Sequence, residues 1–129
     1  MSKFIIQVNS AAYSGSHSYR AYRCTKALLE TGHDVLHVFF YQDGVLNTNQ
    51  LNSPANDEFD LRAAWQSLSD TYHIPLINCA SAALRRGVLS ETEAIENGYA
   101  HWNTNLPFTM AGLGELVTGL EKADRLLNF

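Results

Sequence analysis

The chain has 129 residues, of which 46% are hydrophobic and 17% are charged, so its composition is that of one globular domain. Its formal net charge of -4 gives no basic surface for RNA or DNA, and we expect no direct nucleic-acid binding. The longest apolar run, residues 35–41, is too short to cross a bilayer, and the first ten residues lack the apolar stretch of a secretory signal. We therefore expect a single domain over residues 1–129, located in the cytoplasm and without membrane contact.

The first third of the chain predicts a β–α–β unit. The apolar runs at 3–9 and 34–41 are typical of strands that are covered on both faces of a parallel sheet. Between them, residues 16–31 have apolar positions at helical spacing and are followed by Gly32, which favours a helix end.

The middle of the chain predicts a long loop, a helix and a third strand. Residues 42–57 are crowded with Asn, Asp, Gly, Ser and Pro, which indicates a loop, and loops of this length usually serve function. Asn56 or Asp57 is expected to cap a helix. The apolar face of that helix comprises Leu61, Ala64, Trp65, Leu68 and Tyr72. Residues 74–79 predict the third strand, with Pro75 near its beginning.

The last third of the chain again alternates helical and extended patterns. In chain order these predict a short helix over 80–86, a helix that begins at 90–94, a loop over 106–114, a helix over 115–123 and a closing strand over 124–129. Strands that alternate with helices predict a three-layer α/β domain on a mainly parallel sheet.

Cys79 stands where the third strand passes into the next helix. In an open parallel sheet, chemistry gathers at this edge, and the amides of a helix N-terminus favour a thiolate over a thiol. We therefore expect Cys79 to be a nucleophile whose sulfur is exposed enough to react, with a packed structural cysteine as the alternative. Cys24 shares the apolar face of its helix with Ala21 and Leu28 and is expected in the core. Both thiols are expected to stay reduced.

Cys79 and Arg85 also have the C-x5-R spacing of phosphatases and arsenate reductases. In those enzymes the intervening loop wraps an oxyanion and commonly uses glycine. Here residues 80–84 contain no glycine and favour a helix, which carries Arg85 about 9 Å along the axis from the thiol. The phosphatase hypothesis is therefore disfavoured, although the spacing alone does not exclude it.

The five histidines predict no metal site. His33 and His37 are four residues apart on a predicted strand, a span of about 13 Å, which is too long for one ion. His37 is expected to be packed in the core or at an interface. Sequence does not rank the remaining histidines as bases for the thiol, and a solvated surface position is expected for each: His17, His73 and His101.

Several stretches of the chain resemble one bacterial family. They are FFYQDGV at 39–45 within the longer segment 38–68, CASAALRRG at 79–87, FTMAGLGELV at 108–117 and ADRLLNF at 123–129. These segments are similar to the sulfurtransferase subunits of the DsrE/TusD family, and the similarity covers essentially the whole chain.

This resemblance implies a DsrE-like α/β fold and a role for Cys79 as the residue that accepts a sulfane sulfur as a persulfide and passes it to another protein's thiol. It implies assembly with TusB-like and TusC-like subunits as a dimer of heterotrimers. It also implies a TusA-like sulfur donor and a TusE-like acceptor, with the sulfur ending as the 2-thio group of a wobble uridine in tRNA. Thiol exchange of this kind requires no metal or organic cofactor.

Two alternatives to this function stay open at this point. The same chemistry serves DsrE-type trafficking in dissimilatory sulfur oxidation, and a structural subunit with an incidental cysteine would act only as a scaffold. We further expect residues 42–45, with Asp43 and Gly44, to form the rim of a pocket around Cys79, although Asp43 is equally suited to a turn.

Overall fold

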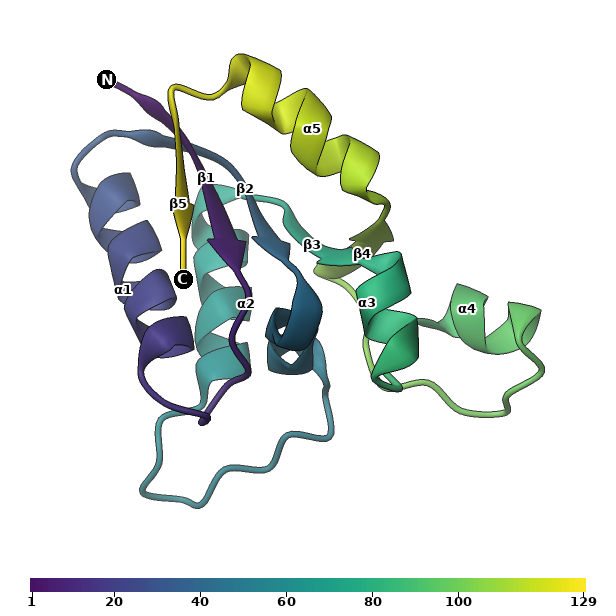
Figure 1. Cartoon of the computed structure of the whole chain (residues 1–129). Coiled ribbons are helices and arrows are strands. Elements are labelled where there is room, and N and C mark those ends of the chain that lie inside the picture. Colours follow the sequence, from purple (N-terminus) through teal and green to yellow (C-terminus); the bar gives the residue numbers. More distant parts are fainter.

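Five parallel strands form one sheet in the order β4-β3-β2-β1-β5 in the computed structural model, which describes all residues 1–129 (Figure 1). The elements in chain order are β1 (Lys3–Val8), α1 (His17–Glu30), β2 (Asp34–Phe40), the 3-10 helix η1 (Gln42–Thr48), α2 (Leu61–Tyr72), β3 (Leu76–Cys79), α3 (Ala80–Arg85), α4 (Glu91–Glu96), β4 (Phe108–Ala111), α5 (Leu113–Lys122) and β5 (Arg125–Asn128). The predicted α/β class with a parallel sheet is confirmed.

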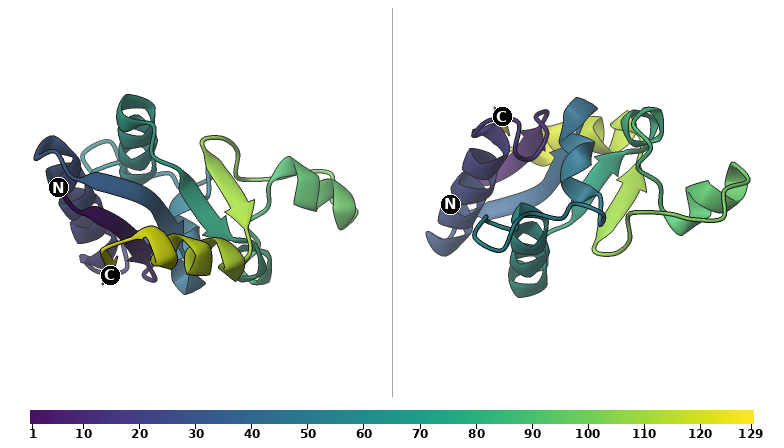
Figure 2. Two further views of the ribbon diagram at one scale, coloured as in Figure 1. Left: turned by 90° about the horizontal axis from the view of Figure 1, so that it is seen from above. Right: turned by 90° about the horizontal axis from the view of Figure 1, so that it is seen from below.

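Helices cover both faces of this sheet, and Figure 2 shows α2 and α5 on opposite sides of the strands. On one face the Trp65 ring of α2 packs against Phe40 of β2 with 5.5 Å between ring centroids. Tyr22 of α1 meets the same indole at 5.6 Å, which joins the two helices. On the other face α5 approaches the strands so closely that a Cβ at Gly119 would lie 2.6 Å from a ring carbon of His37. The sheet is thus the middle of three layers.

Two segments predicted as loops contain regular structure. Within 42–57, residues Gln42–Thr48 wind into η1, and within 106–114, residues Phe108–Ala111 form β4. The prediction for β4 was wrong because a four-residue strand carries little periodic signal, and its pairing with β3 decides its conformation. The prediction for 42–48 was wrong because turn-forming residues also suit a tight 3-10 helix.

Helix ends agree with the sequence in three places and differ in one. Gly32 and Gly87 follow α1 and α3 with positive φ angles of 87° and 71°. Ser90 opens α4 with a capping box in which Glu93 accepts a hydrogen bond from the Ser90 N–H at 3.1 Å. The cap of α2 is Asp60, whose carboxylate accepts a hydrogen bond from the Ala63 N–H at 3.1 Å. The predicted caps, Asn56 and Asp57, do not cap this helix. The helix begins at Leu61, so only the residue directly before it can reach its free amides.

None of the helices is both long enough and apolar enough to pass through a lipid bilayer.

Candidate functional site at the carboxyl end of β3

Cys79 occupies the junction that the sequence predicted. It is the last residue of β3 and the N-cap of α3, with extended φ and ψ angles of -66° and 115°. In the sheet it pairs with Ala111, the last residue of β4. The amides of the first turn of α3 have no partner within the helix and follow the thiol directly.

Strand alternation determines which face of the sheet the thiol occupies. Ile77 pairs with Phe39 of β2, and Cys79 lies two residues further along the same strand. Residues two apart on a strand share a face, so Cys79, Ile77 and Phe39 lie on one side of the sheet. His37 is also two residues from Phe39 and packs beneath α5. The thiol therefore lies on the face that α5 covers, while Asn78 points to the α2 side.

The folded chain buries Cys79, leaving only 3% of the residue exposed, as part of the main hydrophobic core. The expectation of an exposed sulfur is therefore wrong for the single chain. The physical reason is the central position of β3, which has a strand on each side and buried side chains along all four of its residues. A reacting partner can reach this sulfur only after neighbouring groups move or rearrange in an assembly.

The segment η1 is anchored on the strand that carries the thiol. The Asn78 side-chain N–H donates to Thr48 Oγ1 at 2.9 Å, and Thr48 Oγ1 donates to the Val45 carbonyl at 2.9 Å. Gly44 lies directly on the end of β1, where a Cβ would fall 1.8 Å from the Val8 carbonyl oxygen. These contacts hold η1 at the carboxyl edge of β1 and β3.

Asp43 faces Arg86, the residue that follows α3. Arg86 Nε donates to Asp43 Oδ1 at 2.8 Å, and Arg86 Nη1 donates to the Ala82 carbonyl at 3.1 Å. The carboxylate thus binds a neighbouring guanidinium, and the structure gives it no hydrogen bond to the thiol. The structure shows no pocket rim formed by Asp43 around Cys79. It shows instead that η1 packs against both β3 and α3.

The other residues considered from the sequence do not gather around Cys79. Arg85 is exposed at the end of α3, and the residues between it and Cys79 form a regular helix, so no oxyanion loop is built. Cys24 is only half-buried, and this burial raises the pKa of its thiol. The prediction of a core position was wrong because the inner face of α1 consists of Ser18, Ala21 and Thr25.

The histidines likewise stand apart from the thiol. Of the three considered as bases, all are exposed and none hydrogen-bonds to Cys79: His17, His73 and His101. His33 accepts a hydrogen bond from the Ser2 N–H at 3.2 Å. His37 is buried, as expected, and burial lowers its pKa. No group of three metal-ligating side chains comes together.

Two features escaped the sequence-based prediction. One is the Asp43–Arg86 pair, because the sequence directs attention to Arg85 through its spacing from Cys79. The other is a pocket beside β4, which was missed together with the strand itself. The residues FTMA between Pro107 and Gly112 were the available signal, since they are a short apolar run between two breakers.

Comparisons with known proteins agree with this architecture. The DsrE/DsrF-like family model matches residues 2–129. The chain is 47% identical over 126 residues to a sulfurtransferase TusD homolog of Vibrio cholerae, and this alignment covers 98% of this chain and 96% of that protein. It is 45% identical over 126 residues to sulfurtransferase TusD of Proteus mirabilis, with 98% and 97% covered.

A solved structure gives the same result for the fold. The ychN protein from E. coli matches with a TM-score of 0.79 at 20% sequence identity, and the match covers 100% of both chains. Since the family model spans residues 2–129 and the two relatives match over nearly their full length, the chain belongs to the DsrE/DsrF-like family.

Proposed function

We propose that this chain is a sulfurtransferase of a sulfur relay, with Cys79 as the residue that carries the sulfur. The observation that supports this best is the position of the thiol: it ends a central parallel strand and caps the following helix, in a chain 47% identical to a TusD homolog. The only other cysteine, Cys24, lies within α1 and caps no helix.

The proposed reaction is an exchange between thiols and persulfides. The Cys79 thiolate attacks the outer sulfur of a donor persulfide, a new S–S bond forms, and the donor leaves as a thiolate. In the second step an acceptor thiolate attacks the outer sulfur on Cys79 and restores the free thiolate. Each step breaks one S–S bond and forms another, so no external oxidant, metal or organic cofactor is needed.

The proposed setting is the cytoplasm, with a TusA-like donor, a TusE-like acceptor and TusB-like and TusC-like subunits in the same assembly. The final product is the 2-thio group of the wobble uridine in tRNA. The relatives named TusD support this pathway over DsrE-type sulfur oxidation. We expect the assembly to make the buried thiol reachable, because only Gly119 of α5 is buried in the single chain, which leaves the other side chains of this helix available to a partner.

Burial of Cys79 favours a second candidate, a non-catalytic scaffold subunit. Incubation with a protein persulfide donor, followed by intact mass measurement, distinguishes the two. A relay subunit gains one sulfur atom that a reductant removes; Cys79→Ser abolishes the gain, and the matched variant Cys24→Ser retains it. A scaffold shows no adduct even with its partner subunits present. Loss of 2-thiouridine in cells that carry only the Cys79→Ser form tests the pathway.

A further inference from the structure

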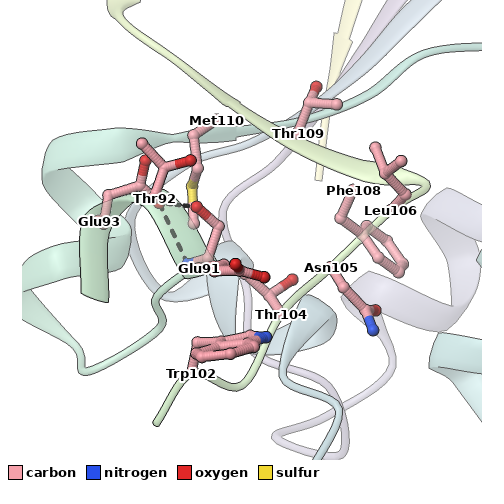
Figure 3. Close-up of a pocket in the computed structure, with 11 residues that line it drawn as sticks. Glu91, Thr92, Glu93, Trp102, Thr104, Asn105, Leu106, Phe108, Thr109 and Met110 are labelled. Atoms are coloured by element: carbon pink, nitrogen blue, oxygen red, sulfur yellow. Dashed lines mark hydrogen bonds between the residues drawn. The ribbon is translucent and has the colours of Figure 1, made fainter. Parts of the chain in front are cut away.

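A pocket of about 420 Å³ lies between the first turn of α4 and strand β4 (Figure 3). In Figure 3 the side chains of Glu91 and Glu93 come from α4, and those of Trp102, Thr104 and Asn105 come from the segment that leads into β4. β4 is an edge strand that pairs with β3 alone, so half of its backbone groups have no partner in the sheet.

The wall of this pocket is acidic. Glu91 and Glu93 both line it, and no lysine, arginine or histidine does. The only ion pair in the structure joins Asp43 to Arg86, so neither carboxylate of the pocket is neutralised by a cation. The Arg62 guanidinium does not itself line the pocket; it donates to Asn105 Oδ1 at 3.1 Å and lies 5.0 Å from the centroid of the Phe108 ring, and both of these residues do line it. The pocket therefore attracts a positive charge.

Thr104 supplies a second, independent indication of a ligand. The residue is 1% exposed, lines the pocket, and its hydroxyl has no hydrogen-bond partner. Its backbone N–H donates a hydrogen bond to the Leu89 carbonyl at 3.0 Å. Buried hydroxyls are normally paired, and the oxygen of this one can accept a hydrogen bond from a donor that enters the pocket.

The remaining wall suits a charged group on an apolar stem. Trp102 presents an exposed indole, the aromatic ring that cations prefer. Leu106, which also lines the pocket, is 76% exposed and offers apolar contact to an incoming segment. Carboxylates, a hydroxyl acceptor and an indole together match an ammonium or guanidinium group, and they repel a phosphate or a carboxylate.

We propose that this pocket binds an arginine or lysine side chain on an extended segment of a partner protein that lies along β4. A free small cation would leave the unpaired edge of β4 and the exposed Leu106 unused, whereas a peptide strand uses both. β4 ends at Ala111, which pairs with Cys79. A strand added to β4 would lie about 10 Å from β3, two strand spacings away. The inference concerns docking and holds without the sulfur chemistry.

The test uses the full chain and a blocked pentapeptide, acetyl-Val-Thr-Arg-Thr-Val-amide, in an NMR titration at low salt. A second peptide carries citrulline in place of arginine, which keeps the shape and removes the charge. We expect saturable shifts of backbone amides at Thr104 and along β4 with the arginine peptide. The citrulline peptide should bind at least about threefold more weakly.

Variants assign the binding to the pocket. Glu91→Gln should lower the affinity for the arginine peptide by at least about threefold. Glu96→Gln, which removes an exposed carboxylate of the same helix outside the pocket, should leave the affinity unchanged. Thr104→Val should weaken binding without loss of folding, because it removes a buried hydroxyl that has no partner. Cys79→Ser should bind the arginine peptide as the wild type does, because Cys79 does not line the pocket. A failure of the proposed sulfur relay is therefore distinguishable from a failure of peptide docking.

Three results would overturn the proposal: no saturable shift up to a few millimolar peptide, equal affinity for the citrulline peptide, or shifts confined to residues away from α4 and β4.

Discussion

Asp43 and Arg86 form an ion pair at the carboxyl edge of the sheet, with 2.8 Å between Oδ1 and Nε. Asp43 belongs to η1, which follows β2, and Arg86 follows α3, so the pair joins the segments that come after two adjacent strands. The side chains are 64% and 28% exposed, so water and salt screen their attraction.

Asp43→Asn is expected to lower the free energy of unfolding by less than about 1 kcal/mol, because exposed ion pairs contribute little. The loss should shrink as salt is added, which urea denaturation at low and high ionic strength can measure. A double-mutant cycle with Arg86→Gln isolates the pair, and Asp57→Asn is the matched exposed control. A coupling free energy of zero would mean that the contact has no stabilising effect.

Gly44→Ala is expected to be strongly destabilising, by about 2 kcal/mol or more, because its Cβ would fall 1.8 Å from the Val8 carbonyl oxygen. That oxygen belongs to the backbone at the end of β1 and cannot rotate away. In the matched variant Gly114→Ala the new Cβ meets no atom within 4 Å, so stability should stay the same or rise slightly. Thermal or urea unfolding measures the stability of both variants. A small loss of stability in Gly44→Ala would contradict the prediction, because it would mean that η1 can move away from β1 with little loss of free energy.

Much of the fold follows from sequence because its signals are local. β1 and β2 are apolar runs covered on both faces, and glycines with positive φ follow α1 and α3. The position of Cys79 also follows, because a strand that ends where an alanine-rich helix begins leaves its last residue at the helix cap.

The features that sequence did not predict depend on long-range contacts. β4 is a strand because it pairs with β3, and η1 is fixed by Asn78, Val8 and Arg86, residues that only the fold brings to it. The burial of Cys79 is of the same kind. Nothing in LINCA indicates that strands on both sides and α5 above would leave the residue only 3% exposed.

Alkylation of Cys24 should require a higher pH than alkylation of an ordinary thiol. Burial raises the pKa of this residue above its usual 9.0, and only the thiolate reacts. In Cys79→Ser, where Cys24 is the only thiol, the rate with iodoacetamide should therefore keep rising past pH 9.0. Mass spectrometry of quenched samples measures the rate, and a short peptide with one cysteine provides the reference curve. A midpoint below that of the peptide would contradict the prediction.

His37 makes the stability of the fold depend on pH. It lies under α5, where a Cβ at Gly119 would fall 2.6 Å from its ring, and its Nε2 has no hydrogen-bond partner. Burial lowers the pKa of this imidazole from 6.5, and the charge of Glu115 on α5 opposes the shift in part. Because the folded chain takes up the proton at a lower pH than the unfolded chain does, the unfolded chain binds more protons in the interval between the two pKa values.

The contribution of His37 to the free energy of unfolding should therefore be complete above pH 6.5. It should decrease as the pH falls from 6.5 through the lowered pKa of the folded state. His37→Leu should flatten this decrease, because it removes the titrating group and leaves no new unpaired polar atom. Urea denaturation at several values between about pH 5 and pH 7 measures the slope, while carboxylates dominate below that interval. An unchanged slope in His37→Leu would place the proton uptake elsewhere in the chain.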